Sequence, residues 1–466
     1  MSPLLAAVFA LLLYLLVRLL HITTPASAPL IYAKDRSSQF VQSVLTLCPI
    51  LQQPYFPPLL WGKSGHVQTV LYAKMGRVNV PVPNGIRHSI LLVDGATLTF
   101  DLHKPKVPHK SGESYCLLIC PGIGNNSESH YMRTLVDYAQ KNGYIAVVLN
   151  HIGSHKTIPL TAARIFTYGG TEELHLVRKE VEKLLPESNI ILVGCSMGGN
   201  IVVKYLGENR EHQEGILAAV SICQGYDVLK AKPLLLSWYN LRRAYLYVMT
   251  RNQKNLIRIH KKQLLSDEIK CKCDIDEKKV FSSITLEQLD EAFTRRFHGC
   301  ETLDEYYQRN SCGAHITNIK IPLLLVNAED DPIVPLDLLE CPKTAAGLLP
   351  NVIFALTKHG GHLGFFEKGI IRPDCITWMD RLIVEYADTI VTLHKEGVLP
   401  LSGGDCTKSA LDGLIDGHHG LDSPTHPLRK EGADDQVVSQ SVENVDSVTD
   451  DLVSYPLLNG YIDVKH

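Results

Sequence analysis

Short apolar runs alternate with amphipathic stretches between residues 88 and 360. Short runs rich in β-branched residues are typical of strands, whereas apolar residues three and four positions apart are typical of helices. The strand candidates span residues 89–93, 98–102, 115–120, 145–150, 190–194, 217–222, 321–326 and 352–356. This alternation predicts an α/β fold with a mostly parallel eight-stranded sheet covered by helices on both faces.

One of the helices between these strands is predicted over residues 172–185. Leu174, Val177, Val181 and Leu184 recur there at helical spacing and would form one apolar face. Such a face indicates a helix that packs on the sheet.

A long insertion, residues 226–315, separates the sixth and seventh strand candidates and has helical but no strand periodicity. We expect a helical cap here. Its apolar and aromatic residues lie near many Lys and Arg residues, which suits a lipid tail that arrives from an anionic surface. A plain helical subdomain with a solvated charged face is the alternative.

The N-terminus is apolar from residue 4 to residue 17 and stays so beyond Arg18. We predict a transmembrane signal-anchor over residues 1–22 of a single-pass membrane protein, because the run is about as long as a bilayer is thick. A cleaved signal peptide and a helix packed elsewhere are the alternatives. Arg18, Lys34 and Arg36 all follow the run, which favours a cytoplasmic catalytic domain.

The remaining boundaries follow from composition. Residues 23–87 are expected to form an N-terminal extension, residues 88–395 the folded domain, and residues 396–466 an acidic disordered tail. Residues 401–466 carry 4 Lys and Arg against 12 Asp and Glu, whereas the whole chain has a net charge of −3. No part is basic enough to predict nucleic-acid binding.

The most informative motif is Gly194-Cys-Ser-Met-Gly-Gly199, which lies between a strand candidate and a predicted helix. Strand, glycine-flanked serine and helix in that order form the nucleophile elbow of α/β-hydrolases. A side chain at Gly194 or Gly198 would crowd the neighbouring strand or helix. Ser196 is the candidate nucleophile. Met197 would begin the helix, and its backbone N–H would stabilise a developing oxyanion.

A serine nucleophile needs a histidine base and an acid to orient it, in the chain order Ser, Asp, His in this fold. The strand candidate at 321–326 runs into an acidic cluster, in which Asp331 precedes Pro-Ile-Val-Pro. We predict Asp331 as the acid, with Asp330 bonded to loop amides or facing water.

The base is expected on the glycine-rich loop after the last strand candidate, which carries His359 and His362. Glycines beside His362 would let the backbone approach the serine, so we predict His362 as the base. His359 would support it or pack on the strand end.

The second oxyanion donor is expected on the loop Cys120-Pro-Gly-Ile-Gly124, after the third strand candidate, and we predict the N–H of Ile123. An ordinary Pro-Gly turn is the alternative. This chemistry needs no cofactor and no metal, and the cysteines predict neither a disulfide framework nor a metal site.

These motifs resemble those of the fourth abhydrolase family, which comprises membrane-anchored eukaryotic lipases and bacterial esterase relatives. The segments that carry the resemblance are Pro57-Pro-Leu-Leu-Trp-Gly-Lys-Ser-Gly-His-Val-Gln-Thr69, Asn142-Gly-Tyr144, Gly194-Cys-Ser-Met-Gly-Gly-Asn-Ile201, Lys204-Tyr-Leu-Gly-Glu208 and His359-Gly-Gly-His-Leu-Gly-Phe-Phe366. The likeness spans about residues 30–395 and stops before the tail. Trp61–Thr69 has no role derivable from the residues; closing the sheet edge and lining the pocket entrance are both open.

The resemblance implies a membrane serine esterase that hydrolyses monoacylglycerols such as 2-arachidonoylglycerol, with wider ester and triacylglycerol lipase activity. It implies steroid-dependent activation in some members, and a domain outside the cytosol. The triad carries over onto Ser196, Asp331 and His362. Two alternatives stay open: an acyltransferase or phospholipase that uses the same residues, and a non-catalytic receptor for lipid or steroid.

Overall fold

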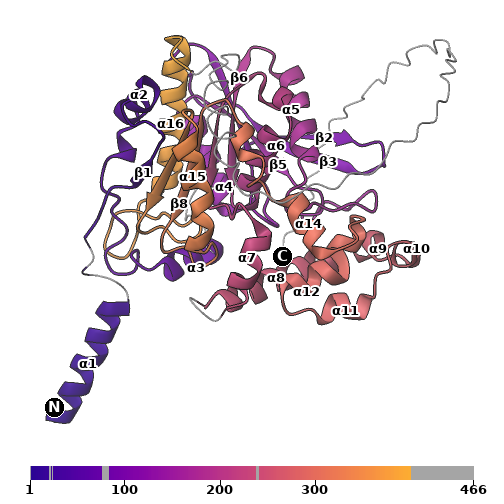
Figure 1. Cartoon of the computed structure of the whole chain (residues 1–466), viewed down its shortest axis with the longest axis horizontal. Coiled ribbons are helices and arrows are strands. Elements are labelled where there is room, and N and C mark those ends of the chain that lie inside the picture. The colour runs from indigo at the N-terminus through magenta and orange to yellow at the C-terminus, as the bar shows by residue number, and fades with distance from the viewer. Residues whose placement is uncertain (1, 20–22, 24, 76–82, 238–240, 400–466) are drawn as a thin grey trace, which may run out of the picture. The chain divides into compact units, whose positions relative to one another are not determined.

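The computed structural model describes residues 2–19, 23, 25–75, 83–237 and 241–399 (Figure 1). Within these residues the chain forms a nine-stranded sheet in the order β1-β9-β8-β7-β6-β4-β5-β3-β2. Strands β4 to β9 pair in parallel, and β1, β2 and β3 pair antiparallel at the two edges. The α/β-hydrolase architecture is therefore confirmed.

The strands are β1 (Leu30–Tyr32), β2 (Ile86–Leu91), β3 (Thr97–His103), β4 (Ser114–Cys120), β5 (Ile145–Asn150), β6 (Ser188–Cys195), β7 (Ile216–Ile222), β8 (Leu323–Ala328) and β9 (Val352–Thr357). The prediction of eight strands was wrong by one, because β1 was missed. Three residues are too few to show a period of two. β1 pairs with β9, and Tyr32 stacks on Phe354 with ring centroids 5.5 Å apart.

Strand β8 corresponds to the candidate at residues 321–326 but begins two residues later than predicted, after Pro322. Proline has no N–H to donate to a ladder, so it is confined to strand ends and edges. Its carbonyl still accepts a hydrogen bond from the Ala219 N–H at 2.9 Å. The strand also ends two residues later than predicted, at Ala328, directly before the acidic cluster.

Helices cover both faces of the sheet (Figure 1). One face packs against α5 (Glu172–Leu184), α6 (Met197–Glu208) and α15 (Glu340–Leu348), and the other against α2 (Gln39–Leu47), α4 (His130–Lys141) and α16 (Trp378–Lys395). Side chains of neighbouring residues on a strand point to opposite faces of the sheet. On β6, Leu192 packs in the core with α5, α6 and α15, and Ile191 packs in the core with α2, α4 and α16. Both faces are buried, which explains why the central strands are continuous apolar runs.

The predicted apolar face of the helix at 172–185 is mostly confirmed. Leu174, Val177 and Val181 are fully buried in α5. Leu184 is the exception, since it is the last residue of the helix and is 38% exposed, while Leu185 after it packs against the core.

The described residues of the insertion between β7 and β8, which omit 238–240, form helices joined by turns and contain no strand. It contains α7 (Val228–Leu235), α8 (Arg242–Ile259), α9 (Lys261–Leu264), α10 (Asp267–Lys272), α11 (Glu277–Ser282), α12 (Leu286–Leu289), a π-helical segment (Asp290–Thr294), α13 (Arg295–Phe297) and α14 (Leu303–Asn310). Figure 1 shows these helices together on one side of the sheet.

The N-terminal segment contains α1 (Pro3–Leu19) and, further on, α3 (Gly65–Met75). The predicted anchor, residues 1–22, coincides with α1, but residues 1 and 20–22 lie outside the described residues. No helix in the described part of the chain has both the length and the apolar character needed to cross a membrane. Most of the predicted acidic tail, from residue 400 onward, also lies outside the described residues.

Candidate active site

The predicted elbow forms between β6 and α6, and Ser196 is its single connecting residue. Ser196 has φ 55° and ψ −118°, a backbone conformation that residues with a side chain rarely adopt. Its N–H donates to the carbonyl of Ile222 on β7 at 2.8 Å, which holds the turn against the neighbouring strand. Such strain at a strand-to-helix turn is typical of a nucleophile raised above its sheet.

The glycines around Ser196 are required by close backbone approach. A Cβ at Gly194 would lie 2.4 Å from the carbonyl oxygen of Gly198, and a Cβ at Gly198 would lie 1.9 Å from that of Cys120. Both distances are far inside van der Waals contact. The spacing of the motif therefore has the steric cause that the sequence suggested.

Asp331 lies in the loop after β8 and is 2% exposed. Its Oδ1 accepts hydrogen bonds from the N–H groups of Ile333 at 2.7 Å and Val334 at 3.0 Å. Its Oδ2 lies 2.8 Å from Nδ1 of His362. The two backbone donors fix the carboxylate, so that one oxygen always faces the imidazole.

His362 lies in the loop after β9 and is 7% exposed. Its Nε2 is 2.8 Å from Oγ of Ser196, on the side of the ring opposite Asp331. The structure therefore brings the three predicted residues together in one chain of contacts, although they are up to 166 positions apart in sequence. An imidazole placed this way can take a proton from the serine while the carboxylate stabilises the resulting cation.

Asp330 bonds to a loop amide, which is one of the two placements predicted for it, and His359 lies beside Asp330. Oδ1 of Asp330 accepts a hydrogen bond from the Gly361 N–H at 2.8 Å, and its Oδ2 lies 3.3 Å from Nδ1 of His359. Burial raises the pKa of Asp330, and the bonds from His359 and Gly361 oppose that shift. This pair holds the loop that carries His362.

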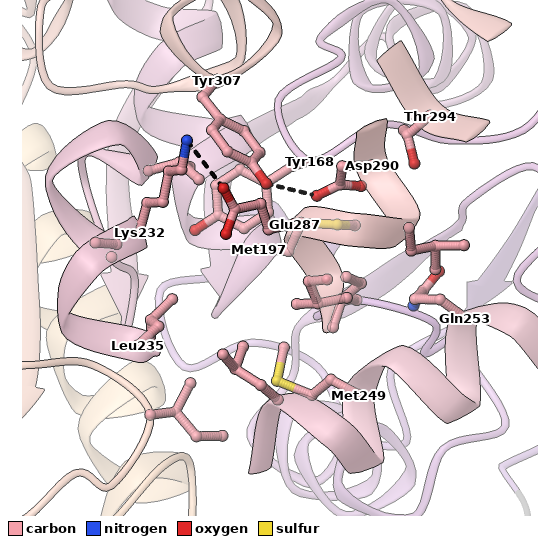
Figure 2. Close-up of a pocket in the computed structure, with 18 of the residues that line it drawn as sticks. Tyr168, Met197, Lys232, Leu235, Met249, Gln253, Glu287, Asp290, Thr294 and Tyr307 are labelled. Atoms are coloured by element: carbon pink, nitrogen blue, oxygen red, sulfur yellow. Dashed lines mark hydrogen bonds and ion pairs between the residues drawn. The ribbon is translucent and has the colours of Figure 1, made fainter. Parts of the chain in front are cut away.

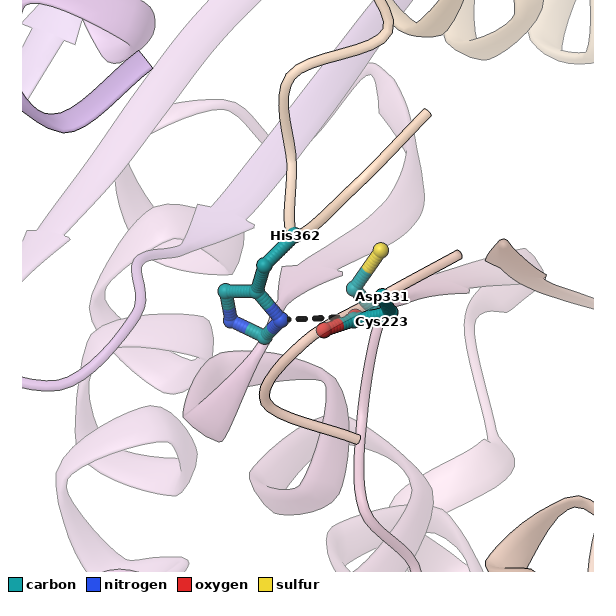
Figure 3. Close-up of side chains that lie close together, drawn as sticks. All are labelled: Cys223, Asp331 and His362. Carbon is teal, nitrogen blue, oxygen red and sulfur yellow. Dashed lines mark hydrogen bonds and ion pairs between the residues drawn. The ribbon is translucent and has the colours of Figure 1, made fainter. Parts of the chain in front are cut away.

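Cys223 lies beside Asp331 and His362, as Figure 3 shows. Its Sγ and one ligand atom each of Asp331 and His362 lie within 4.8 Å of one another, so the donor set of a metal site is present. Burial, followed by the charge of Asp331, raises the pKa of the Cys223 thiol well above its usual range. A neutral thiol is a poor ligand, and Asp331 already accepts two backbone hydrogen bonds, so this arrangement fits proton transfer better than metal binding.

The predicted oxyanion loop follows β4 and lies against the elbow. A Cβ at Gly122 would lie 3.4 Å from that of Ser196, and the Gly122 N–H donates to the hydroxyl of Tyr131 at 2.9 Å. Ile123 and Met197 line the same pocket as Ser196. Met197 is the first residue of α6, where an N–H has no acceptor within the helix. Ile123 and Met197, which were predicted to supply the two donors, therefore both line the pocket that contains the serine.

A buried contact between His151 and Glu173 supports this loop, and no sequence pattern indicated it. Nδ1 of His151 is 2.9 Å from Glu173, and its Nε2 is 3.3 Å from the carbonyl oxygen of Pro121. Burial alone would lower the pKa of His151, but the contacts with Cys120 and Glu173 raise it to about 10. His151 therefore bridges Glu173 and the backbone at Pro121, and these contacts hold the start of the loop.

An apolar pocket opens beside Ser196 and His362, between the sheet and the helical insertion. Its lining includes Ser196, Met197 and His362 from the site, together with apolar side chains of the insertion: Val228, Ala231, Leu235, Leu236, Leu246, Met249, Ile257, Leu289 and Phe293. The insertion therefore forms much of the apolar wall of the pocket. A cavity of this character suits the hydrocarbon part of an ester substrate.

Part of the pocket wall is polar (Figure 2). Lys232 pairs with Glu287 at 3.0 Å, and the hydroxyl of Tyr307 donates to Oδ2 of Asp290 at 3.1 Å. Burial raises the pKa of Asp290 to about 6, although the bonds from Thr294 and Tyr307 oppose the shift.

Replacement of Asp290 by asparagine should therefore stabilise the fold at pH 8. Above about pH 6 the folded state holds Asp290 as a poorly solvated carboxylate, which destabilises it. Between about pH 6 and pH 3.8 the folded state binds a proton at Asp290 that the unfolded state does not yet bind, so this destabilisation is lost as the pH falls. We expect a gain of roughly 1–3 kcal/mol at pH 8 that vanishes near pH 4. Chemical denaturation of both proteins across this pH range measures it, and a gain that does not depend on pH would contradict it.

The segment Trp61–Thr69, for which the sequence offered no role, contacts the loop of His362. Thr69 and Gln68 both bond to backbone groups of that loop. The segment neither closes a sheet edge nor lines the pocket within the described residues. Only the family resemblance drew attention to this segment, because the residues that it contacts lie almost 300 positions later in the sequence.

Comparisons with known proteins agree with this architecture. A family model described as alpha/beta hydrolase fold matches residues 115–369. The chain is 47% identical over 390 residues to "Monoacylglycerol lipase ABHD2" of Danio rerio, which covers 84% of this chain and 90% of that protein. It is 46% identical to the protein of the same name from Homo sapiens, and the match covers 83% of this chain and 91% of that protein. It is 26% identical to "Phospholipase ABHD3" of Mus musculus, and that match covers 80% of this chain and 86% of the relative. The chain therefore belongs to the α/β-hydrolase fold family, within the abhydrolase group that was expected from its motifs.

Proposed function

We propose that this chain is a lipase: a serine hydrolase that cleaves acyl esters of glycerol, with monoacylglycerols as its main substrates. The observation that supports this most is the chain of contacts from Asp331 through His362 to Ser196 beside an apolar pocket. The activity named for the 46–47% identical relatives supports the choice of substrate.

In the proposed mechanism, Oγ of Ser196 attacks the ester carbonyl while Nε2 of His362 accepts its proton. The carbonyl electrons move onto oxygen, and the N–H groups of Met197 and Ile123 stabilise that oxyanion. The C–O bond to glycerol then breaks, and His362 returns the proton to the glycerol oxygen. Water, deprotonated by His362, attacks the acyl-enzyme, and the fatty acid leaves as Ser196 regains its proton.

We propose further that the chain acts at a membrane as a single-pass protein anchored by the apolar segment that contains α1. The apolar sequence from residue 4 to residue 17 supports this. Steroid-dependent activation, which the resemblance implies for some members, would place a steroid in the same apolar pocket. Extraction of membranes at alkaline pH tests the anchor: the protein should stay with the lipid, and its release into solution would contradict the anchor.

The substrate is tested by hydrolysis assays on the purified full-length chain in detergent micelles. A monoacylglycerol should yield free fatty acid and glycerol faster than a phospholipid of the same acyl chain yields its lysolipid. Faster turnover of the phospholipid would instead favour the phospholipase alternative, to which the 26% identical relative lends its name. Acyl transfer to an added alcohol in place of hydrolysis would favour an acyltransferase, and no turnover of any ester would favour a receptor.

A further inference from the structure

Two loops carry the acid and the base of the proposed triad, and a segment from the N-terminal region touches both. We call this segment, residues Trp61 to Thr69, the strap. It consists of a turn followed by the first residues of α3. A Cβ at Gly65 of the strap would lie 1.8 Å from the carbonyl oxygen of Asp330, and a Cβ at Gly361 would lie 2.4 Å from that of Gly65. Glycine at both positions lets the strap lie directly against the two loops.

The hydroxyl of Thr69 forms two hydrogen bonds. It accepts one from the backbone N–H of His362 at 2.9 Å and donates one to the carbonyl of Gly65 at 2.7 Å. Thr69 is 4% exposed and His362 is 7% exposed, so water cannot easily replace either bond. The threonine therefore ties the backbone of the histidine to the first turn of α3.

Gln68 makes the next connection along the same loop. Its Oε1 accepts a hydrogen bond from the Phe366 N–H at 2.9 Å, and its Nε2 donates to the carbonyl of Gly62 at 2.6 Å and to the hydroxyl of Tyr55 at 3.0 Å. Gln68 is fully buried. The amide thus joins the end of the histidine loop to the start of the strap.

Consecutive backbone N–H groups of the histidine loop are held by different elements. Asp330 accepts from Gly361, and Thr69 accepts from His362. The imidazole of His362 is in turn held by Asp331 on one side and meets Ser196 on the other. Of these contacts, the bond that the His362 N–H donates to Thr69 is the one that holds the backbone of His362 from outside the two loops.

We infer that Thr69 is a positioning residue for His362, and that the strap sets the distance between the histidine and Ser196. The inference rests on the proposed function, since it assigns the strap to the same reaction. A base displaced by about 1 Å can cost on the order of 100-fold in rate, so a hydroxyl that fixes its backbone affects turnover without touching substrate.

The test compares Thr69→Val, Thr69→Ser and Thr69→Ala in the full-length chain. Valine keeps the shape of threonine but removes the hydroxyl, so kcat for a monoacylglycerol should fall about 10- to 100-fold. KM should stay within about threefold, because no strap residue is among the described residues that line the pocket. Serine restores the hydroxyl and should return kcat to within about threefold of wild type.

Thr389→Val is the matched control. Thr389 is also buried in a helix, α16, and its hydroxyl likewise donates to the carbonyl four residues earlier, that of Glu385, at 2.8 Å. The same atoms are removed there without loss of a bond to the histidine loop. This variant should keep the wild-type kcat, and an equal loss of kcat in it would overturn the inference.

Labelling of Ser196 by a fluorophosphonate gives a second readout that needs no lipid substrate. The labelling rate of folded protein should fall with kcat in Thr69→Val and recover in Thr69→Ser. Should the valine variant not fold, Thr69→Ala carries the same test. Wild-type rates in both hydroxyl-free variants, or an equal loss in the serine variant, would overturn the role of Thr69 while leaving the proposed function intact. An inactive, unlabelled wild type would instead overturn the proposed function.

Discussion

Replacement of Ser196 by alanine should lower kcat for ester hydrolysis by about a million-fold. The alanine removes the only atom that the proposed mechanism bonds to the acyl group, and His362 is left without the proton it would accept at 2.8 Å. It keeps a Cβ at the strained φ of 55°, so the elbow should retain its shape. Residual activity would then come from the oxyanion donors and substrate binding alone.

The measurement is release of fatty acid from a monoacylglycerol by purified protein, with thermal unfolding as the check on the fold. Ser221→Ala is the control, because Ser221 is a fully buried serine on β7 whose hydroxyl has no hydrogen-bond partner among the described residues. This control should retain nearly full activity. A Ser196→Ala protein that folds and keeps more than about a hundredth of the wild-type rate would remove Ser196 from the mechanism.

Replacement of Asp331 by asparagine should lower kcat by about 10,000-fold without disturbing the loop. The N–H groups of Ile333 and Val334 both donate to Oδ1, so the amide oxygen must take that place. The amide nitrogen is then forced toward Nδ1 of His362. That nitrogen must become an acceptor, which moves the remaining ring proton to Nε2, where it faces Ser196 and prevents proton transfer.

Asp330→Asn is the matched control for this change. Asp330 is the adjacent carboxylate, and it bonds to Gly361 and His359 rather than to His362. Its replacement should reduce kcat by no more than about tenfold, since the amide oxygen can still accept from Gly361. Comparable losses in the two variants would contradict the assignment of Asp331 as the orienting acid.

The sheet and the positions of the three candidate catalytic residues could be predicted because their signals are local in sequence. Central strands buried on both faces are apolar runs, and polar groups at their carboxyl ends stand out against them. The elbow adds glycines whose steric cause is equally local, at Gly194 and Gly198. Ser196, Asp331 and His362 therefore lie where the sequence placed them, each in a loop at the end of a strand.

What could not be predicted depends on contacts between distant segments. β1 is too short to show a period, and its place is set by pairing with β9. Thr69 is 293 positions before His362, and no property of a lone threonine indicates such a partner. In the insertion, amphipathic helices show that one face is buried, but not that Asp290 and Tyr307 would meet at the pocket wall.

The central claim is that the hydroxyl of Ser196 is activated by His362 and Asp331. The most direct measurement is mass spectrometry of the folded, full-length chain after reaction with a fluorophosphonate. We predict a single adduct, located on Ser196, that is lost when the protein is denatured first or when His362 is replaced by alanine. No adduct on the folded chain, or an adduct on another residue, would contradict the claim.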